Sequence, residues 1–412
     1  MVNKASTTNN DDDRSAQAAF KEQFLELMRL LPSMVFLVLC LIASTVSFLQ
    51  PPSTFLSSRQ DMPKHILPPK RRQSAKSSSP SNTTLRDFLL HPEGIYLAMA
   101  PSFFGFYGYF GALAGIEEGL FTETTPEEDS IGSSSLSSSS LLIQHDILKG
   151  VAGASAGAMA AILLAAGISP IKAAQFCSTI QLQDFFDFPA WFSLIKGDKF
   201  EAIMNEFLMS SSPIATSASS NATHPELSRS LQLQDALIPV GISAFDLQTL
   251  QAKILSEGSM ARAARASACF PILFEPVGWI DEATGRNYMF IDGGLRDTSG
   301  LAGLAHFTGT AQQSTSLPKR VVNMVVGDFH LKSVPGPSDM PAGLTTSSLL
   351  SISIQNLPQC GPWAMKNGPL AVEASRRALL ASLDLPLYKG KTDSHFELHI
   401  DASHFVVEEP KR

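Results

Sequence analysis

Short apolar runs begin to alternate with segments of helical character near residue 86. The apolar runs predict strands and the longer segments between them predict helices. We expect strands at 95–99, 146–153, 236–244 and 321–326, and helices at 109–120 and 156–166. Strands that alternate with helices are typical of a parallel sheet covered by helices. The pattern therefore predicts an α/β fold, a three-layer α/β/α sandwich with a mostly parallel central sheet.

A different pattern precedes this alternation. Residues 30–49 are almost wholly apolar, and about 20 such residues can span a bilayer as a helix. The segment from there to residue 85 is rich in Ser, Pro, Lys and Arg, as disordered chains and organelle transit peptides are. We interpret 30–49 as a signal anchor or a cleaved signal. This predicts a membrane-associated protein of the secretory pathway, with the endoplasmic reticulum included, or of a plastid.

Two regions follow from these patterns. We expect 1–85 to be a disordered targeting or anchoring region and 86–412 to be one catalytic domain. Two serine-rich tracts, near 130–140 and 210–220, interrupt the domain. They offer little apolar area to bury, so we expect them to be disordered surface insertions.

Composition limits the classes of function. The chain carries 31 Lys and Arg against 38 Asp and Glu, a net charge of −7, whereas a nucleic-acid-binding protein carries a basic surplus. Its four cysteines lie far apart, which argues against a disulfide framework or a CxxC metal site. His395 and His399 have the spacing of a metal pair, but no third ligand is recognisable beside them. We therefore expect no metal there.

The first candidate for chemistry is Ser155. Residues 153–157, Gly-Ala-Ser-Ala-Gly, fit the pattern G-x-S-x-G between an apolar run and a helical segment. Glycines at both ends allow a sharp strand-to-helix turn that exposes the serine hydroxyl. The amides at the start of the following helix favour a developing negative charge. The alternative is a turn whose small residues only serve helix packing.

The second candidate is Asp292, which with Gly293 and Gly294 follows the apolar run 288–291. A carboxylate at a strand end, followed by two glycines, can face a cleft without a covering side chain. There it can accept the proton of Ser155 as a general base. The alternative is an Asp-Gly turn that only ends a strand.

The third candidate is the segment 102–108, which joins a predicted strand to a predicted helix. Its glycines, Gly105 and Gly108, can expose backbone N–H groups that would stabilise an oxyanion. Four aromatic side chains in the segment can wall an acyl-chain pocket or belong to the core: Phe103, Phe104, Phe106 and Tyr107.

The order of these elements, a glycine loop, then G-x-S-x-G, then D-G-G, resembles the patatin-like phospholipase family. Three further segments support the resemblance. Residues 112–120 are similar to the helix after the family's oxyanion loop, and 240–247 and 266–277 are similar to the strand and the segment ahead of its aspartate. The resemblance covers about 95–304, roughly half of the chain.

The resemblance implies roles for individual residues. Ser155 would be the nucleophile and Asp292 its only partner, a Ser–Asp dyad without a histidine. The oxyanion hole would consist of backbone amides of Gly105, Phe106, Tyr107 and Gly108. The motif glycines would be Gly153, Gly157, Gly293 and Gly294. The reaction would be hydrolysis of a phospholipid or neutral-lipid ester through an acyl-enzyme, without metal or organic cofactor. Lipid substrate and a membrane surface would be the partners, and nucleic acid would not.

The oxyanion segment departs from the family pattern. Tyr107 stands where the family usually has a basic residue, and the spacing to Gly111 is two residues short. An alignment without a gap would instead place Phe106 on the last glycine of the loop. Two registers of the backbone donors are therefore open.

Other interpretations remain open from the sequence. A Ser-His-Asp hydrolase would use Ser155, Asp292 and a late histidine, with His404 in the expected order and His395 or His399 as further candidates. A protein that binds lipid without turnover would also fit the altered loop.

Further candidates lie near these motifs. Arg262, Arg265 and Arg296 can meet a lipid headgroup or pair with carboxylates. Cys269 lies in an apolar stretch, which favours a core position over a nucleophile.

Overall fold

The structure is a computed structural model that describes residues 80–406, apart from gaps. The gaps are 122–138, 186, 188–192, 194, 216–229, 272, 282–283, 310–319, 328–334, 342–343, 345–346 and 362–363. The described residues all lie in the compact unit Lys76–Arg412. The predicted segment at 30–49, and nearly all of the predicted region 1–85, lie outside the described residues. Within the described ranges, no helix is both long enough and apolar enough to cross a bilayer.

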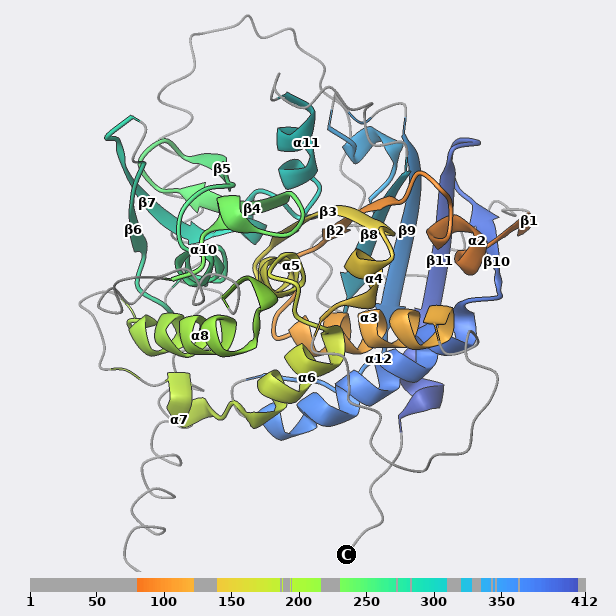
Figure 1. Cartoon of the computed structure of the whole chain (residues 1–412), viewed down its shortest axis with the longest axis horizontal. Coiled ribbons are helices and arrows are strands. Elements are labelled where there is room, and N and C mark those ends of the chain that lie inside the picture. The colour runs from red at the N-terminus through yellow and green to blue at the C-terminus, as the bar shows by residue number, and fades with distance from the viewer. Residues whose placement is uncertain are drawn as a thin grey trace, which may run out of the picture. The chain divides into compact units, whose positions relative to one another are not determined.

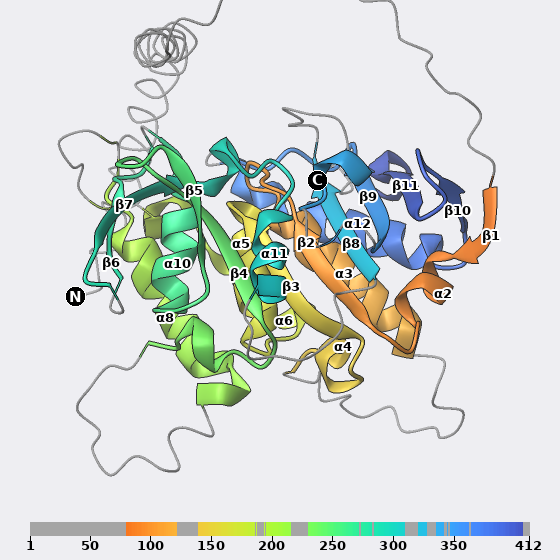
Figure 2. The same ribbon diagram turned by 90° about the horizontal axis from the view of Figure 1, so that it is seen from above.

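An eleven-stranded mixed sheet forms the centre of the fold. Its strands are β1 (Pro80–Thr84), β2 (Ile95–Met99), β3 (Leu148–Ala154), β4 (Val240–Asp246), β5 (Gln251–Leu255), β6 (Val277–Ile280), β7 (Asn287–Asp292), β8 (Arg320–Val326), β9 (Ser348–Gln355), β10 (Pro386–Lys389) and β11 (His395–Asp401). The order is β1-β10-β11-β9-β8-β2-β3-β4-β7-β6, with β5 paired to β4 (Figure 2).

The α/β fold class is confirmed, but the sheet is parallel only at its centre. The six strands from β11 to β4 pair in parallel, whereas every pairing outside them is antiparallel. The reason is connectivity: parallel neighbours need long crossovers, while the chain reverses directly between β4 and β5, β6 and β7, and β10 and β11. The predicted mostly parallel sheet therefore describes the centre and not the edges.

Helices surround the sheet. They are α2 (Leu85–Leu89), α3 (Phe106–Phe121), α4 (Leu141–Gln144), α5 (Ala156–Ala165), α6 (Pro170–Thr179), α7 (Leu182–Phe185), α8 (Asp198–Ser211), α10 (Met260–Ser267), α11 (Ala302–Gly309) and α12 (Gly368–Ser382). Short 3-10 turns follow several strands, among them η3 (Gly293–Leu295) and η7 (Ala402–Phe405). Figure 1 shows α3 beside α12 on one side of the sheet and α11 on the other.

Successive side chains of the central strands point to opposite faces of the sheet and so contribute to two hydrophobic cores, one on each face. On β2, Leu97 and Met99 belong to the larger core, while Ala98 between them belongs to the smaller one. The smaller core also contains Leu301 and Leu304, which belong to the α11 segment. Successive side chains of a strand point to opposite faces, so both faces of the sheet are covered. This is the three-layer arrangement that the strand–helix alternation predicted.

The predicted element boundaries differ from the observed ones where local chemistry intervenes. The strand predicted from residue 236 begins at Val240, directly after Pro239, which has no N–H for a ladder. The helix predicted from residue 109 begins three residues earlier, at Phe106.

The two serine-rich tracts are described only at their ends. At 139–140, Ser140 is buried, and its hydroxyl donates to Oε1 of the buried Glu117 at 2.6 Å. At 210–215, α8 ends at Ser211, and the buried Ser212 donates to the Ala166 carbonyl at 2.6 Å. Their remainders lie outside the described residues.

Candidate active site

Ser155 occupies the sharp turn between β3 and α5. Its backbone has φ 53° and ψ −122°, a conformation that a residue with a side chain rarely adopts. Such a residue costs on the order of 1–3 kcal/mol and persists only where the surrounding structure holds it. The turn places Ser155 immediately before the first turn of α5 and leaves it partly exposed, while its neighbours on both sides are buried. This is the geometry expected of a nucleophile elbow.

The glycines of the motif let three backbone segments meet at this turn. A Cβ atom on Gly153 would lie 2.3 Å from the Gly157 carbonyl oxygen, and one on Gly157 would lie 2.2 Å from the Met99 carbonyl oxygen. Neither contact is possible for a real side chain, and the opposing atoms are backbone that cannot rotate away. Close packing of β2, β3 and α5 therefore requires glycine at both positions.

Strand β4 brings Asp292 to the same place. One edge of β4 pairs with β5 along 242–246, so β3 and β7 share the other edge. Ala154, the last residue of β3, lies opposite Ser243, and Asp292, the last residue of β7, lies opposite Ala244. The two strands run towards each other and end at adjacent positions of β4. The residue that follows β3 is Ser155, and it therefore lies beside Asp292.

The two side chains are hydrogen-bonded. The Ser155 hydroxyl donates to Oδ2 of Asp292 at 2.7 Å, and the Gly294 amide donates to Oδ1 at 2.7 Å. The backbone N–H of Asp292 donates to the Cys269 carbonyl at 2.9 Å, which fixes the residue itself. Each carboxylate oxygen thus has one partner, and the oxygen that faces Ser155 is free to accept its proton.

Burial sets the acidity of this carboxyl group. Asp292 is 5% exposed. Desolvation raises its pKa from the ordinary 3.8 to about 6, and the hydrogen bonds from Ser155 and Gly294 offset part of that rise. A carboxylate with a pKa near 6 is ionised at neutral pH and is a stronger base than an exposed aspartate.

Ser267 completes the surroundings of Ser155, and sequence reasoning did not single it out. It is the last residue of α10 and is fully buried. Its hydroxyl accepts the Ser155 amide at 2.9 Å and donates to the Ser243 carbonyl at 2.6 Å. The segment 266–271 was recognised as a family-like pattern, but only the structure shows that its serine contacts Ser155.

The predicted oxyanion segment forms the end of a loop and the start of a helix. Gly105 precedes α3, while Phe106, Tyr107 and Gly108 form its first turn and are buried. The Tyr107 hydroxyl donates to the Cys177 carbonyl at 3.1 Å, and burial raises its pKa. Amides in a first helical turn have no carbonyl partner within the helix, so the helix itself does not use the amides of these three residues.

An earlier part of the same segment lies against the aspartate turn. A Cβ atom on Gly294 would lie 2.6 Å from Cβ of Pro101. Residues 100–105, between β2 and α3, therefore contain the stretch that borders the turn at Gly294, two residues after Asp292. The part of the segment that meets this turn thus lies before Gly105.

Two aromatic side chains, one from the β2–α3 segment and one from the segment after α10, contact each other outside the main core. Phe103 is 38% exposed, and its ring lies 6.0 Å from that of the partly buried Phe270 in an edge-on arrangement. Phe103 is two residues from Pro101, and Phe270 follows Cys269, whose carbonyl accepts the Asp292 amide. By contrast, Phe106 and Tyr107 are buried members of the core. The four aromatic residues of this segment therefore divide into core residues and one exposed ring.

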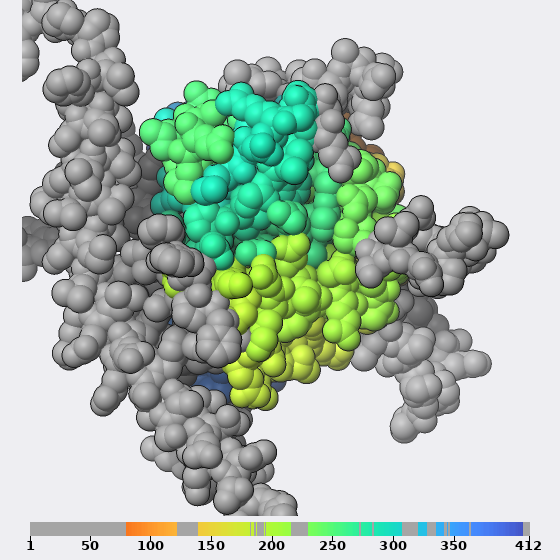
Figure 3. Space-filling model, turned by 90° about the vertical axis from the view of Figure 1, so that its left-hand side faces the viewer, coloured from red at the N-terminus to blue at the C-terminus, as the bar shows by residue number. Residues whose placement is uncertain are grey.

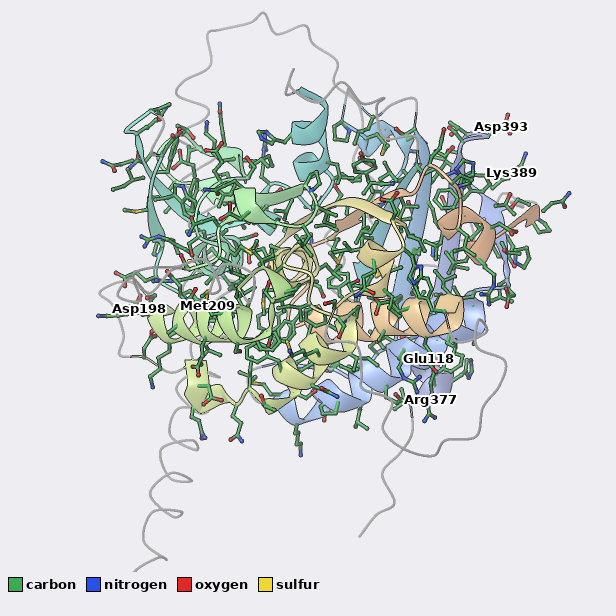
Figure 4. All side chains as sticks on the ribbon, in the orientation of Figure 1. Glu118, Asp198, Met209, Arg377, Lys389 and Asp393 are labelled. Atoms are coloured by element: carbon green, nitrogen blue, oxygen red, sulfur yellow. The ribbon has the colours of Figure 1, made fainter. Side chains whose placement is uncertain are left out.

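The remaining candidate residues have other partners. Arg265 pairs with Asp198 at 2.7 Å and Glu201 at 3.0 Å, both on α8, and Figure 4 marks Asp198 at the start of that helix. Arg262 donates to the Gly278 carbonyl at 2.6 Å. Figure 3 shows this side of the molecule, where the β6–β7 region lies above α8. These two arginines therefore serve structural contacts, whereas Arg296 is exposed and close in sequence to Asp292.

The thiol and the histidines also take structural positions. The Cys269 thiol donates to the Glu275 carbonyl at 3.0 Å, and burial raises its pKa to about 12. His395 is buried in β11, and its Nδ1 accepts the Lys391 amide at 3.2 Å. Strands β9, β8 and β2 separate β11 from β3. Among the residues that the structure describes, no group of three or more His, Cys, Asp or Glu is arranged to hold a metal ion.

Comparison with known proteins supports the resemblance drawn from the motifs. Residues 145–305 match the family model of patatin-like phospholipases, so the predicted resemblance is confirmed over this span. The span includes Ser155, Ser267 and Asp292 and begins after the β2–α3 segment. No curated protein matches the chain.

Solved structures resemble the chain distantly. VipD from Legionella pneumophila is 15% identical, with a TM-score of 0.42 over 71% of this chain and 67% of VipD. Full-length ExoU, in complex with SpcU from the type III secretion system of Pseudomonas aeruginosa, is 14% identical, with a TM-score of 0.34 over 71% of this chain and 52% of ExoU. Another structure of the type III effector ExoU is 14% identical, with a TM-score of 0.32. The chain thus spans about half the length of ExoU.

The predicted localisation is contradicted. It placed the protein at a membrane of the secretory pathway or in a plastid, on the basis of segment 30–49. The structures that resemble the chain are bacterial proteins, VipD and the type III effector ExoU, and not plastid or endoplasmic-reticulum proteins. An apolar run can indicate a bilayer-spanning helix, but by itself it does not identify a compartment.

Proposed function

We propose that this chain, which carries a patatin-like phospholipase domain at 145–305, hydrolyses carboxylic esters of lipids with Ser155 as nucleophile and Asp292 as general base. The observation that carries the proposal is the 2.7 Å hydrogen bond from the Ser155 hydroxyl to the buried Asp292 carboxylate, at an elbow that exposes the serine. A serine becomes a good nucleophile when an adjacent base can take its proton.

The reaction would proceed in two stages. In the first, Ser155 Oγ attacks the ester carbonyl and its proton passes to Oδ2 of Asp292, which gives a tetrahedral oxyanion. Collapse releases the alcohol, which takes the proton from Asp292, and leaves an acyl group on Ser155. In the second, water attacks the acyl carbonyl, passes its proton to Asp292, and the fatty acid leaves as the proton returns to Ser155 Oγ.

The raised pKa of Asp292 suits both directions of proton transfer. An ordinary aspartic acid has a pKa of 3.8 and would be a weak base towards a serine hydroxyl. With a pKa of about 6, the carboxylate is still ionised at neutral pH but holds a proton more firmly during attack. Its proximity to Ser155 also supplies the orientation that an aspartate free in solution lacks.

Backbone amides would stabilise the oxyanion. The Ser155 amide already donates to Ser267, so the next donors along the chain are those of Ala156 and Gly157 in the first turn of α5. The positive end of the α5 dipole points at the same place. Amides of the β2–α3 segment, from the loop before Gly105 through Gly108, would complete the hole from the side that borders Asp292.

The acyl chain of the substrate would lie against Phe103 and Phe270. Their rings contact each other outside the core, and both residues are joined through short backbone segments to the surroundings of Asp292. An exposed aromatic surface beside a reactive serine favours an apolar substituent over a polar one. This supports a lipid as the substrate and leaves the headgroup open.

The test is labelling of the full chain with a fluorophosphonate, which reacts with activated serines, beside Ser155→Ala and Asp292→Ala. We expect the wild type to be labelled and to release fatty acid from at least one of phosphatidylcholine vesicles, galactolipid vesicles and a triacylglycerol emulsion. Both variants should stay folded by circular dichroism and lose both activities. A folded wild type that is neither labelled nor active would favour lipid binding without turnover.

A further inference from the structure

The Ser267 hydroxyl makes two hydrogen bonds to backbone groups of the candidate site. It accepts the Ser155 amide at 2.9 Å and donates its own proton to the Ser243 carbonyl at 2.6 Å. A hydroxyl can make both contacts from one atom, since it carries one donor and two acceptor lone pairs. Ser267 is fully buried, so no water competes for either contact.

These two contacts join Ser155 to the strand that also carries Asp292. Ser243 lies opposite Ala154, the residue before Ser155, and is followed by Ala244, which lies opposite Asp292. Its own hydroxyl donates to Oδ2 of the buried Asp297 at 2.5 Å. Strand pairing and the contact with Asp297 hold Ser243 in place. Ser267 links the Ser155 backbone to the Ser243 carbonyl.

The turn at Ser155 needs such a contact because its backbone is strained. With φ 53°, the chain leaves the extended path of β3 at Ser155, and strand pairing with β4 ends one residue earlier, at Ala154. A small rotation of this residue would move Oγ away from Asp292. The amide contact from Ser267 opposes that rotation.

We propose that Ser267 is a positioning residue that holds the Ser155 backbone in the strained turn and so keeps the Ser155 hydroxyl on Asp292. The inference rests on the proposed function for its effect on catalysis, but the contact itself does not depend on turnover. It also gives the family-like segment 266–271 a role that the Ser–Asp pair alone leaves unexplained. Loss of the hydroxyl would leave the Ser155 amide and the Ser243 carbonyl without this partner.

The experiment compares full-length wild type with Ser267→Ala, Ser267→Cys and a matched control, Ser375→Ala. Ser375 is equally buried, but its hydroxyl donates to the Ala371 carbonyl within α12. All four proteins are compared for thermal melting, fluorophosphonate labelling rate, kcat and KM. Amide hydrogen exchange of the peptide spanning 151–159 is measured in parallel.

We expect Ser267→Ala to lower kcat and the labelling rate on the order of tenfold to a hundredfold, with KM nearly unchanged, because misplacement of a nucleophile affects chemistry more than binding. Ser267→Cys, with a weaker donor and acceptor, should fall between wild type and Ser267→Ala. Exchange at the Ser155 amide should be faster in Ser267→Ala than in wild type or Ser375→Ala.

Two results would overturn the inference: unchanged labelling and kcat in a folded Ser267→Ala, or equal losses in Ser267→Ala and Ser375→Ala. An inactive, unlabelled wild type would instead refute the proposed function. In that case hydrogen exchange still decides, because unchanged exchange at Ser155 in Ser267→Ala contradicts the positioning role and faster exchange supports it.

Discussion

Asp292 lies opposite Ala244, one position beyond the pair that Ala154 forms with Ser243 on the same edge of β4. The separation of Ser155 and Asp292 is therefore fixed by the register of a sheet and not by the course of a loop. Hydrogen-bonded ladders are among the least mobile parts of a protein. The Ser155 and Asp292 side chains are therefore oriented towards each other before any substrate arrives, as the proposed mechanism requires.

The pH dependence of activity should report the ionisation of Asp292. In the proposed mechanism the carboxylate is the active form. Burial raises its pKa to about 6, so kcat/KM should rise with pH through about 6 and level off above it. Well below the midpoint the rise should approach tenfold per pH unit. The measurement is ester hydrolysis across this range with a substrate that does not titrate. A midpoint near the ordinary 3.8 would contradict a buried Asp292 as the controlling base.

Removal of the Asp292 charge should stabilise the protein while it abolishes activity. The folded state binds a proton at Asp292 more tightly than the unfolded chain, so this group favours folding below pH 4 and loses that contribution as pH rises through about 6. Asn does not titrate. Asp292→Asn should therefore be more stable than wild type at pH 8, by about 3 kcal/mol at most, and the difference should shrink towards pH 4. Urea unfolding at both pH values tests this; a variant less stable at pH 8 would contradict it.

Gly293 should not tolerate even one methyl group. A Cβ atom there would lie 2.0 Å from the Ser243 carbonyl oxygen, so β4 and the aspartate turn would have to separate. We expect Gly293→Ala to cost about 3 kcal/mol of unfolding free energy and to remove activity. Gly278→Ala, in β6, is the control, because a Cβ there meets nothing within 4 Å. Equal melting temperatures for the two variants would show that the close approach is absent.

The aromatic pair should set the preference for long acyl chains. Phe103→Ala and Phe270→Ala should each lower kcat/KM for p-nitrophenyl palmitate roughly tenfold, about 1.4 kcal/mol, and change the butyrate ester far less. Phe121→Ala serves as the control. Phe121 is partly buried, but it is the last residue of α3, whereas Phe103 lies just before the first residue of that helix. A uniform loss across chain lengths would place the two rings in the fold and not in the acyl site.

The late histidines should be dispensable for the chemistry. His404 lies in the turn η7 after β11, and β11 is four strand positions from β3, roughly 19 Å at the usual spacing. His404→Ala should therefore retain activity to within about twofold, as surface substitutions usually do. Loss of labelling in a folded His404→Ala would restore the Ser-His-Asp hypothesis. His399→Ala, which changes another exposed histidine of the same region, is the matched control.

Local pattern was enough for much of the fold and for the identity of the candidate residues. The apolar runs predicted β2 and β8 almost to the residue, and small residues around Ser155 predicted the elbow, because these features depend on neighbours in sequence. The order of the three motifs indicated the family that 145–305 match. Pattern did not predict the antiparallel edges of the sheet, since strand direction depends on which distant segments pair.

The working parts of the site were decided only by tertiary structure. Ser155 is 137 residues from Asp292 and 112 from Ser267, and no local rule relates such positions. Pairing of β3 and β7 along one edge of β4 sets the first contact, and the packing of α10 sets the second. The raised pKa of Asp292 has the same origin, because desolvation is a property of everything packed around a group and not of the residue itself.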